Sequence, residues 1–345
     1  MKKIISIDIG SKNLHVAEGS YDKGNLIINK ADSYGVPEGS ITKGKITNHT
    51  ELGDAILYAL KLCNYYDKNV AITVNAAENT IIKELEFPKA KPKELDSMIH
   101  NEMTQVHNIL TTDIIQYKEI ESNTEENDNL KKYRIASISK DFVDQYYQVL
   151  KNVNLKPVTM DININAIDKL FAWAESFNGK EIKNDEAILL MDFGHSTTSV
   201  YIASKELPLF YRQINIGSGK IDKILSGELF LSPEEIEAIK QNENFFEHNI
   251  SDGESNKYSE LKQYFYNLND EIRKILTFFR GRFRNIEVSR GYTFGNGSDL
   301  KGFSEFWDLN LNLTIEQLHS IKGKNSQDIN VNPAHINAIS ALIRN

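Results

Sequence analysis

"IISIDIGSKNLHVAEG", residues 4–19, runs as a strand, turns at an acid followed by a glycine, and resumes as a second strand. Apolar residues predict strands over 4–9 and 14–18, and the Gly-Ser-Lys between them is typical of a tight turn. The second half repeats this pattern in "ILLMDFGHSTTSVYIAS", residues 188–204. A single Asp-x-Gly turn means little, but two at hairpin tips predict a duplicated unit whose acids, Asp8 and Asp192, face one ligand.

The composition favours a two-domain protein of a reducing compartment. A chain of 345 residues corresponds to roughly two domains. The net charge of −8 argues against a nucleic-acid surface spread over the whole protein. The single cysteine, Cys63, cannot form an internal disulfide, which favours the cytosol. Asp8 interrupts the apolar N-terminus, so we interpret it as a strand and not a signal peptide. No window approaches the roughly 18 apolar residues of a membrane helix, so we expect membrane association only through a partner.

The first half is predicted to open as an antiparallel meander and then to be interrupted. A third strand is expected over 26–28, followed by a helix that Thr50 caps. The apolar face of this helix is expected to consist of Leu52, Ile56, Leu57 and Leu60. The later expected elements are a buried strand at 69–75, a helix after the prolines of 86–106, strands at 114–120 and 133–140, a helix at 140–153, a strand at 156–163 and a helix at 163–177. The acidic stretch at 121–130 is interpreted as a solvated loop.

The second half is predicted to restart the meander. Strands are expected over 187–194, 197–204 and 207–217, and a helix begins near Ser232 with Pro233 in its first turn. Residues 242–257 form a polar excursion. A long helix over 261–283 is expected to bury five apolar side chains, those of Leu268, Ile272, Ile275, Leu276 and Phe279. Strand, glycine turn and helix then follow over 286–303, and a terminal helix is expected over 332–344.

The two turns carry the residue types that phosphate binding needs. Glycine lets backbone N–H groups converge on a phosphate oxygen, whereas a neighbouring Asp repels phosphate but holds Mg²⁺ through coordinated water. We expect the turns to clasp the phosphates of a nucleotide, with Asp8 and Asp192 as metal ligands through water. The alternative is that both are ordinary β-turns. The candidate residues are Asp8, Gly10, Ser11, Lys12 and Asn13 in the first turn and Asp192, Gly194, His195, Ser196 and Thr197 in the second.

A third motif, "YTFGNGSDLKGF" at residues 292–303, ends a strand in Gly295, Asn296, Gly297 and Ser298. Bare backbone there would let a base and ribose lie close, with helix-terminal N–H groups for polar contacts. The motif lacks the full G-x-G-x-x-G spacing of a Rossmann fold. A water-activating residue is expected after the first crossover, where Asp161 is the nearest acid. Spacing alone assigns Asp161 no role, so we name no catalytic residue.

Together these motifs resemble the actin-like ATPase superfamily over essentially the whole chain, most closely the PilM family of type IV pilus assembly and next the cell-division family FtsA. "IDIGSKNLHVAE" resembles the first phosphate motif, "MDFGHSTTSVYI" the second and "YTFGNGSDLKGF" the adenosine motif. "EIEAIK" resembles the Ala-Glu-x-x-Lys helix of these families, which implies that Glu237 and Lys240 lie near the adenosine. The chain departs from the pattern at His15, where many relatives have a phosphate-reaching lysine, at Asn296 and at Ser340.

The resemblance implies an α/β, actin-like fold, a ribonuclease H-like duplication of two domains with a nucleotide cleft between them. "EFPKAKPKELDSMIHNEM" resembles the start of the inserted 1C subdomain. The expected division is 1–79 with 158–185 as subdomain 1A, 80–157 as 1C, 186–215 with 270–345 as 2A, and 216–269 as 2B.

The resemblance further implies a cytoplasmic ATP- and Mg²⁺-binding scaffold at the inner face of the cell membrane. Its expected partner is the cytoplasmic tail of a PilN-like membrane protein, with the pilus assembly ATPase as a second partner and no nucleic acid. Enzymatic activity is expected to be at most a slow ATPase. The alternatives are an FtsA-like filament-forming ATPase of cell division and a small-molecule kinase of the same superfamily.

Overall fold

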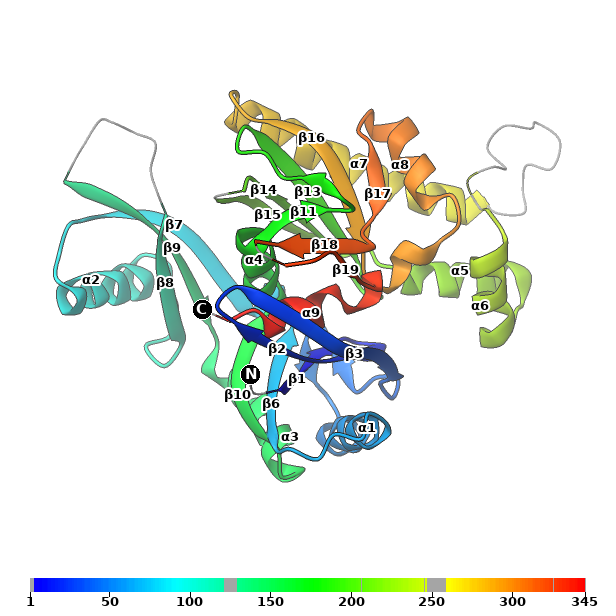
Figure 1. The fold of residues 1–345 in the computed structure, drawn as a ribbon, viewed down its shortest axis with the longest axis horizontal. Coiled ribbons are helices and arrows are strands. Elements are labelled where there is room, and N and C mark those ends of the chain that lie inside the picture. Colours follow the sequence, from blue (N-terminus) through cyan, green and yellow to red (C-terminus); the bar gives the residue numbers. More distant parts are fainter. Residues whose placement is uncertain are drawn as a thin grey trace.

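Two five-stranded sheets with the same internal order form the centre of the molecule (Figure 1). The computed structural model describes residues 3–120, 129–205, 207–244, 246, 259–324 and 326–344. In each sheet three consecutive antiparallel strands are followed by two parallel strands, as expected for a duplicated actin-like fold. The first sheet has the order β10 (Lys156–Ile162), β6 (Asn69–Val74), β1 (Ile4–Ile9), β2 (Asn13–Asp22), β3 (Asn25–Gly35). The second has the order β17 (Ile315–Gln317), β16 (Glu287–Phe294), β13 (Glu186–Phe193), β14 (Thr198–Ala203), β15 (Pro208–Ile214).

The last helix of each half covers the sheet of the other half. Helix α4 (Asn163–Trp173) contacts β14 and β15, whereas α9 (Ile336–Leu342) contacts β1, β2 and β6, and the two helices touch each other. Their apolar faces share one core with the inner faces of both sheets, including Phe177, Tyr292 and Leu342. A small sheet of β12 (Lys180–Glu181), β11 (Ala174–Phe177), β18 (Ser320–Gly323) and β19 (Ile329–Asn330) joins the halves. The halves are therefore held together through a common core.

Further helices cover the outer face of each sheet. Helices α1 (His49–Leu62) and α3 (Lys140–Asn152) pack on the first sheet. Helices α5 (Gly219–Leu229), α7 (Ser259–Arg282) and α8 (Phe303–Leu311) pack on the second, and α6 (Pro233–Asn242) packs on α5. The five apolar residues expected on the long helix are all buried. None of the helices that the structure describes is long and apolar enough to cross a membrane.

A separate layer is inserted between β6 and α3, shown in cyan to the side of the first sheet in Figure 1. It consists of the sheet β7 (Thr80–Pro88), β9 (Leu130–Ile138) and β8 (Ile114–Ile120), with α2 (Pro92–Gln105) on one face. Its small core, with Phe87, Ile99 and Ile135, is distinct from the cores of the two halves. Arg134 ties this layer to the second half, because its Nη2 donates to the Pro208 carbonyl over 2.7 Å.

The remaining described elements are short. They are β4 (Ile41–Thr42), β5 (Lys45–Ile46) and the 3-10 turns η1 (Ala77–Asn79), η3 (Asn296–Asp299) and η4 (Pro333–His335). The expected acidic loop at 121–130 and polar excursion at 242–257 fall largely outside the described residues.

Three local expectations were wrong. Asn48, not Thr50, caps α1: its side chain accepts from the Glu51 N–H over 3.2 Å, so the helix begins two residues earlier. Leu57 does not lie on the buried face of that helix and is 42 % exposed. Residues 174–177 do not continue α4 but form β11, because β18, far away in sequence, offers them a strand partner.

Candidate functional site

The two Asp-x-Gly segments form the same turn at the same place in their sheets. In each turn the glycine N–H donates to the carbonyl three residues later over 3.0 Å, from Gly10 to Asn13 and from Gly194 to Thr197. A side chain is excluded at Gly10, since a Cβ there would lie 2.8 Å from the Asn13 carbonyl oxygen. The acids also correspond, because each lies one residue before the last paired residue of its strand.

The tips of the two turns meet directly. The Ser11 and Ser196 hydroxyls are 2.7 Å apart, although they are 185 residues apart in sequence. Beside them, the Asn75 amide at the end of β6 donates to the Thr197 hydroxyl over 3.1 Å. The structure thus brings the residues predicted for the two turns into one site between the two sheets.

Two carboxylic acids lie at the base of this site. Burial, together with the charge of Asp192, raises the pKa of Asp8 to about 8. Burial raises the pKa of Asp192 to about 6, although the Asn337 amide opposes the shift by donating to Asp192 Oδ2 over 2.9 Å. Asp8 is buried and Asp192 partly buried, and two such carboxylates that repel each other favour a proton or a cation between them. They are therefore suited to hold a divalent cation.

The polar groups around the acids are mainly amides and hydroxyls. Thr73 stands next to Asp8 in the sheet, and its hydroxyl donates to the buried Asn163 side chain over 2.9 Å. Asn163 also lowers the pKa of Asp8 by a hydrogen bond. Asp161 is tied to Lys169 by an ion pair of 2.6 Å, and its other oxygen accepts from Asn165. Asp161 is therefore engaged structurally.

The Gly-Asn-Gly-Ser segment packs against the second turn. Gly295 has a φ of +86°. A Cβ on it would lie 2.3 Å from Asp192 Oδ1, and one on Gly297 would lie 2.4 Å from the Phe193 ring. The missing side chains of these glycines therefore make room for protein atoms, while Asn296 between them is partly exposed. Ser298 is buried, and its hydroxyl donates to the Gly295 carbonyl over 2.7 Å.

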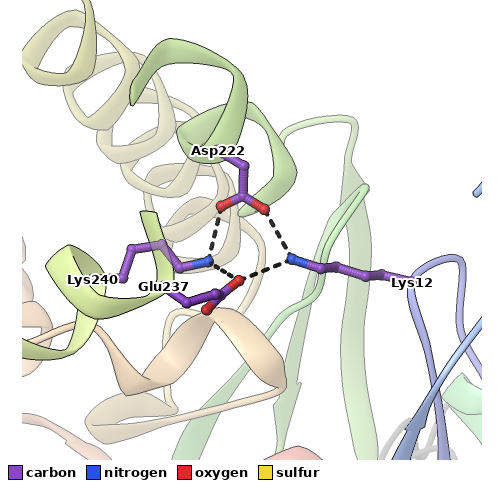
Figure 2. A network of polar contacts seen from close by, with 4 residues as sticks. All are labelled: Lys12, Asp222, Glu237 and Lys240. Atoms are coloured by element: carbon purple, nitrogen blue, oxygen red, sulfur yellow. Dashed lines mark hydrogen bonds and ion pairs between the residues drawn. The ribbon is translucent and has the colours of Figure 1, made fainter. Parts of the chain in front are cut away.

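A ring of four charged side chains closes one side of the site (Figure 2). Lys12 Nζ, from the first turn, lies 3.0 Å from Asp222 Oδ2 on α5 and 3.1 Å from Glu237 Oε1 on α6. Lys240 Nζ lies 2.8 Å from Asp222 Oδ1 and 2.9 Å from Glu237 Oε1. Positive and negative groups alternate around the ring, so its net charge is zero. Lys12 was predicted as a nucleotide-binding residue of the first turn, and here its side chain contacts two carboxylates of the second half.

The contacts of the ring stabilise the charged forms of Asp222, Glu237 and Lys12. Burial raises the pKa of Asp222 and of Glu237, but the bonds and charges of Lys240 and Lys12 together outweigh burial and hold both pKa values below their ordinary range. Partial burial likewise lowers the pKa of Lys12, and its two carboxylate partners more than reverse this. Asp222, Glu237 and Lys12 are therefore ionised at neutral pH.

The two histidines singled out in the sequence are both held by packing. The His195 ring lies against Gly219, where a Cβ would be 2.3 Å from the ring. Burial first, and then the charge of Lys12, lower its pKa, so the ring is neutral. His15 is buried, and its Nδ1 lies 2.8 Å from the Ser33 hydroxyl, which also lies 2.9 Å from His335 Nε2. His15 is therefore engaged with β3 and η4.

Four residues at the site were not anticipated: Asn75, Asn163, Asp222 and Asn337. Asn75 and Asn163 follow the two parallel strands β6 and β10, so their position at the carboxyl ends of these strands was the available signal. Asp222 and Asn337 gave no local signal, because their role depends on pairings across 210 and 145 residues of sequence.

Comparisons with known proteins agree with this architecture. The model of a family described as type IV pilus assembly protein PilM matches residues 6–336. No curated protein matches the chain in sequence. A solved structure titled "PilM-PilN type IV pilus biogenesis complex" is similar with a TM-score of 0.75 and 18 % identity, covering 92 % of this chain and 88 % of that chain.

Two further solved structures share the actin-like fold at lower similarity. The ethanolamine utilization protein EutJ from Carboxydothermus hydrogenoformans has a TM-score of 0.52 and 13 % identity, with coverage of 100 % of this chain and 90 % of that chain. MreB5 of Spiroplasma citri, bound to AMPPNP, has a TM-score of 0.51 and 13 % identity, with coverage of 92 % of each chain. At these identities the similarity establishes the fold.

Proposed function

The chain belongs to the PilM family of type IV pilus assembly proteins, and from this premise we propose that it is an ATP-binding scaffold of the pilus assembly machine. We place it in the cytoplasm at the inner face of the membrane, where it recruits the cytoplasmic tail of a PilN-like membrane protein. The observation that carries the nucleotide part of the proposal is the meeting of the two turns over two buried acids.

The residues of the site fit a nucleotide and its metal ion. Backbone N–H groups of the two turns and the Ser11 and Ser196 hydroxyls are donors suited to phosphate oxygens. Asn337 Oδ1, beside the acids, is buried without a hydrogen-bond partner among the residues that the structure describes, as suits an acceptor for coordinated water. Asp8 and Asp192 would hold Mg²⁺ through water, and the ion would neutralise phosphate charge. MreB5, which shares the fold, is described as bound to AMPPNP.

The same geometry favours slow hydrolysis. Asn163 and Thr73 next to Asp8 can orient a water molecule but cannot accept its proton at neutral pH. Asp161 is occupied by Lys169. We therefore propose binding and conformational signalling, with ATP turnover well below the median of about 10 s⁻¹ for enzymes.

The nucleotide proposal is tested by calorimetric titration of ATP with and without Mg²⁺. Asp8→Asn and Asp192→Asn keep the shape of the side chain and remove the metal-directing charge, so each is expected to weaken binding about tenfold or more, which is ~1.4 kcal/mol. Asp22→Asn, an exposed acid at the far end of β2, is the matched control. Binding that is independent of Mg²⁺, or unchanged in both site variants, contradicts the proposal.

For the partner, a pocket of about 140 Å³ lies where the inserted layer meets the first half. Its lining comes from three parts of the fold: Asn75, Ala76, Ala77, Ile162, Asn163 and Ile164 from the first half, Thr80 and Ile82 from the inserted layer, and Tyr211 from the second half. A peptide can dock in such a groove with backbone hydrogen bonds and a few buried apolar side chains. The similar solved complex contains PilM and PilN by its title.

The partner proposal is tested with a fluorescent peptide that carries the cytoplasmic tail of the PilN-like protein. Ile82→Glu places a charge in the pocket and is expected to weaken binding about tenfold or more. Ile81→Glu is the matched control, because Ile81 is the neighbouring residue, points to the other face of the strand and is already 39 % exposed. Equal affinities of the two variants would remove this pocket from the recognition surface.

A further inference from the structure

We propose that the ring of Lys12, Asp222, Glu237 and Lys240 is a latch between the two halves, and that a polyphosphate releases it by taking Lys12 away from the carboxylates. The release step rests on the proposed nucleotide binding, whereas the latch itself rests on the contacts alone. Lys12 belongs to the first turn, and its partners lie on α5 and α6 of the second half (Figure 2). The ring therefore spans the site from one half to the other.

The α5 end of the latch is fixed to the second turn. The Ser218 N–H donates to the Gly194 carbonyl over 2.9 Å, and the Gly219 N–H donates to the His195 carbonyl over 2.8 Å. A Cβ on Gly217 would lie 2.5 Å from backbone atoms of the second turn, so this segment is in close contact with it. Asp222 follows one helical turn later. By holding Asp222, Lys12 therefore holds the second turn against the first.

A phosphate between the tips must work against this latch. Ser11 and Ser196 now bond to each other, and each hydroxyl has a single proton to donate. When both donate to a phosphate, the bond between them is lost and nothing then holds the two oxygens together. Lys12 comes directly after Ser11 and moves with it. A polyphosphate at the tips offers Lys12 a substitute for the two carboxylates, because it is a dense anion beside the same turn.

The ion pairs of the ring differ in solvent exposure, and the pair of Lys12 with Glu237 is the more exposed. The Lys12 and Glu237 side chains are 40 % and 52 % exposed, whereas those of Lys240 and Asp222 are 15 % and 22 % exposed. Water and salt weaken exposed ion pairs more than sheltered ones. The ring therefore opens at Lys12, and the pair of Lys240 and Asp222 persists and keeps α5 and α6 together.

Two substitutions distinguish the latch, which affects α6 without ligand, from a simple effect of charge on ATP affinity. Lys12→Met removes both contacts between the halves, and Asp222→Asn removes the charge of the less exposed of the two partners of Lys12. Without ligand both variants should therefore speed amide hydrogen exchange of α6, by about threefold to fivefold for an ion pair of this exposure. They leave opposite charges beside the tips. Lys12→Met is expected to weaken ATP binding about fivefold, and Asp222→Asn to strengthen it about threefold.

The experiment measures exchange of α6 and ATP affinity in wild type, both variants, the double variant and Lys274→Met, which removes a remote exposed ion pair with Glu271. The effect of the double variant on exchange should be smaller than the product of the two single effects, because both substitutions break the Lys12–Asp222 contact. Inorganic triphosphate, which has no adenosine to hold α6, should speed α6 exchange in wild type and leave Lys12→Met unchanged.

Unchanged exchange in both ligand-free variants overturns the latch, whatever the nucleotide does. Affinity changes of the same sign in the two variants, or slower α6 exchange with triphosphate, overturn release through Lys12. If wild type binds neither ATP nor triphosphate while the ligand-free variants exchange faster, the nucleotide proposal and the release step fail and the latch stands.

Discussion

The two halves of the chain share a sheet and a turn but differ in what is added between the strands. The first half has the helix α1 between its third and fourth strands, where the second half has α5, α6 and α7. Between the fourth and fifth strands the first half has the inserted layer and α3, where the second half has η3 and α8. Both large additions contact the edge of the site, α5 and α6 through the charged ring and the inserted layer through the pocket beside Asn75 and Asn163.

This difference separates the shared elements, which we propose bind the nucleotide, from the unshared elements, which we propose respond to it. The shared elements place the two acids and the two turns symmetrically, as any ligand held between the halves requires. Each unshared addition is inserted in one half and also contacts the other, the inserted layer through Arg134 and α5 and α6 through Lys12. Movement of one half relative to the other therefore changes these contacts. A scaffold that reports nucleotide to a partner needs both features, and the duplication supplies the first while the additions supply the second.

The largest expected effect tests whether the inserted layer is an independent folding unit. Phe177 is fully buried in the core that both halves share, and Phe177→Ala is expected to cost ~3–5 kcal/mol of unfolding free energy. Ile99 is equally buried, but in the separate core of the inserted layer, and Ile99→Ala is expected to cost ~2–5 kcal/mol within that layer alone.

The two tryptophans make this measurable, since Trp173 and Trp307 both lie in the cores of the two halves and the inserted layer has none. Urea unfolding followed by tryptophan fluorescence should therefore respond to Phe177→Ala and hardly to Ile99→Ala, while hydrogen exchange in α2 should respond to Ile99→Ala. A tryptophan transition shifted equally by both variants would show that the layer unfolds together with the halves.

The sequence predicted the shared parts better than the additions, for physical reasons. Strands of the repeated hairpin are fixed by local apolar runs and by a glycine turn, so the sequence predicted that Asp8 and Asp192 face one ligand. The start of α1 depends on whether Asn48 or Thr50 accepts from a free N–H at the helix end, and residues 174–177 become a strand only because β18 lies beside them. Asp222 lies in an ordinary helix, and only Lys12, 210 residues away, gives it a role.

A second prediction uses a pair of positions where the halves differ. His15 stands opposite Asp8 in the first hairpin, where the second has Ser199 opposite Asp192. Burial, aided by His335, lowers the pKa of His15 to about 3. Between pH 6.5 and 3 the folded state therefore binds fewer protons at His15 than the unfolded state, so stability is lost as pH falls. For this residue the loss between pH 7.5 and pH 5 is about 2 kcal/mol.

Urea unfolding at these two pH values checks this prediction. Compared with wild type, His15→Gln should gain about 2 kcal/mol of stability at pH 5 relative to pH 7.5, because glutamine does not titrate. His49→Gln, at an exposed position at the start of α1, is the matched control. An unchanged pH dependence in His15→Gln would show that His15 is not the titrating group. Ser199 does not titrate, so the second hairpin has no counterpart of this contribution to the pH dependence.

The smallest expected effect compares the two turns themselves. A Cβ at Gly10 would lie 2.8 Å from the Asn13 carbonyl oxygen, whereas one at Gly194 would lie 3.1 Å from the Thr197 carbonyl oxygen. The tighter contact at Gly10 can be relieved only by lengthening the hydrogen bond that the Gly10 N–H donates to the same carbonyl. Gly10→Ala should therefore lower the free energy of unfolding by about 1 kcal/mol more than Gly194→Ala does. Gly281→Ala is the control: nothing lies near its Cβ position in α7, so added helix propensity should stabilise the protein by ~0.5–1 kcal/mol. Equal losses of unfolding free energy in Gly10→Ala and Gly194→Ala would show that both hairpins accommodate the methyl group equally well. The asymmetry between the halves would then lie in the additions and not in the turns.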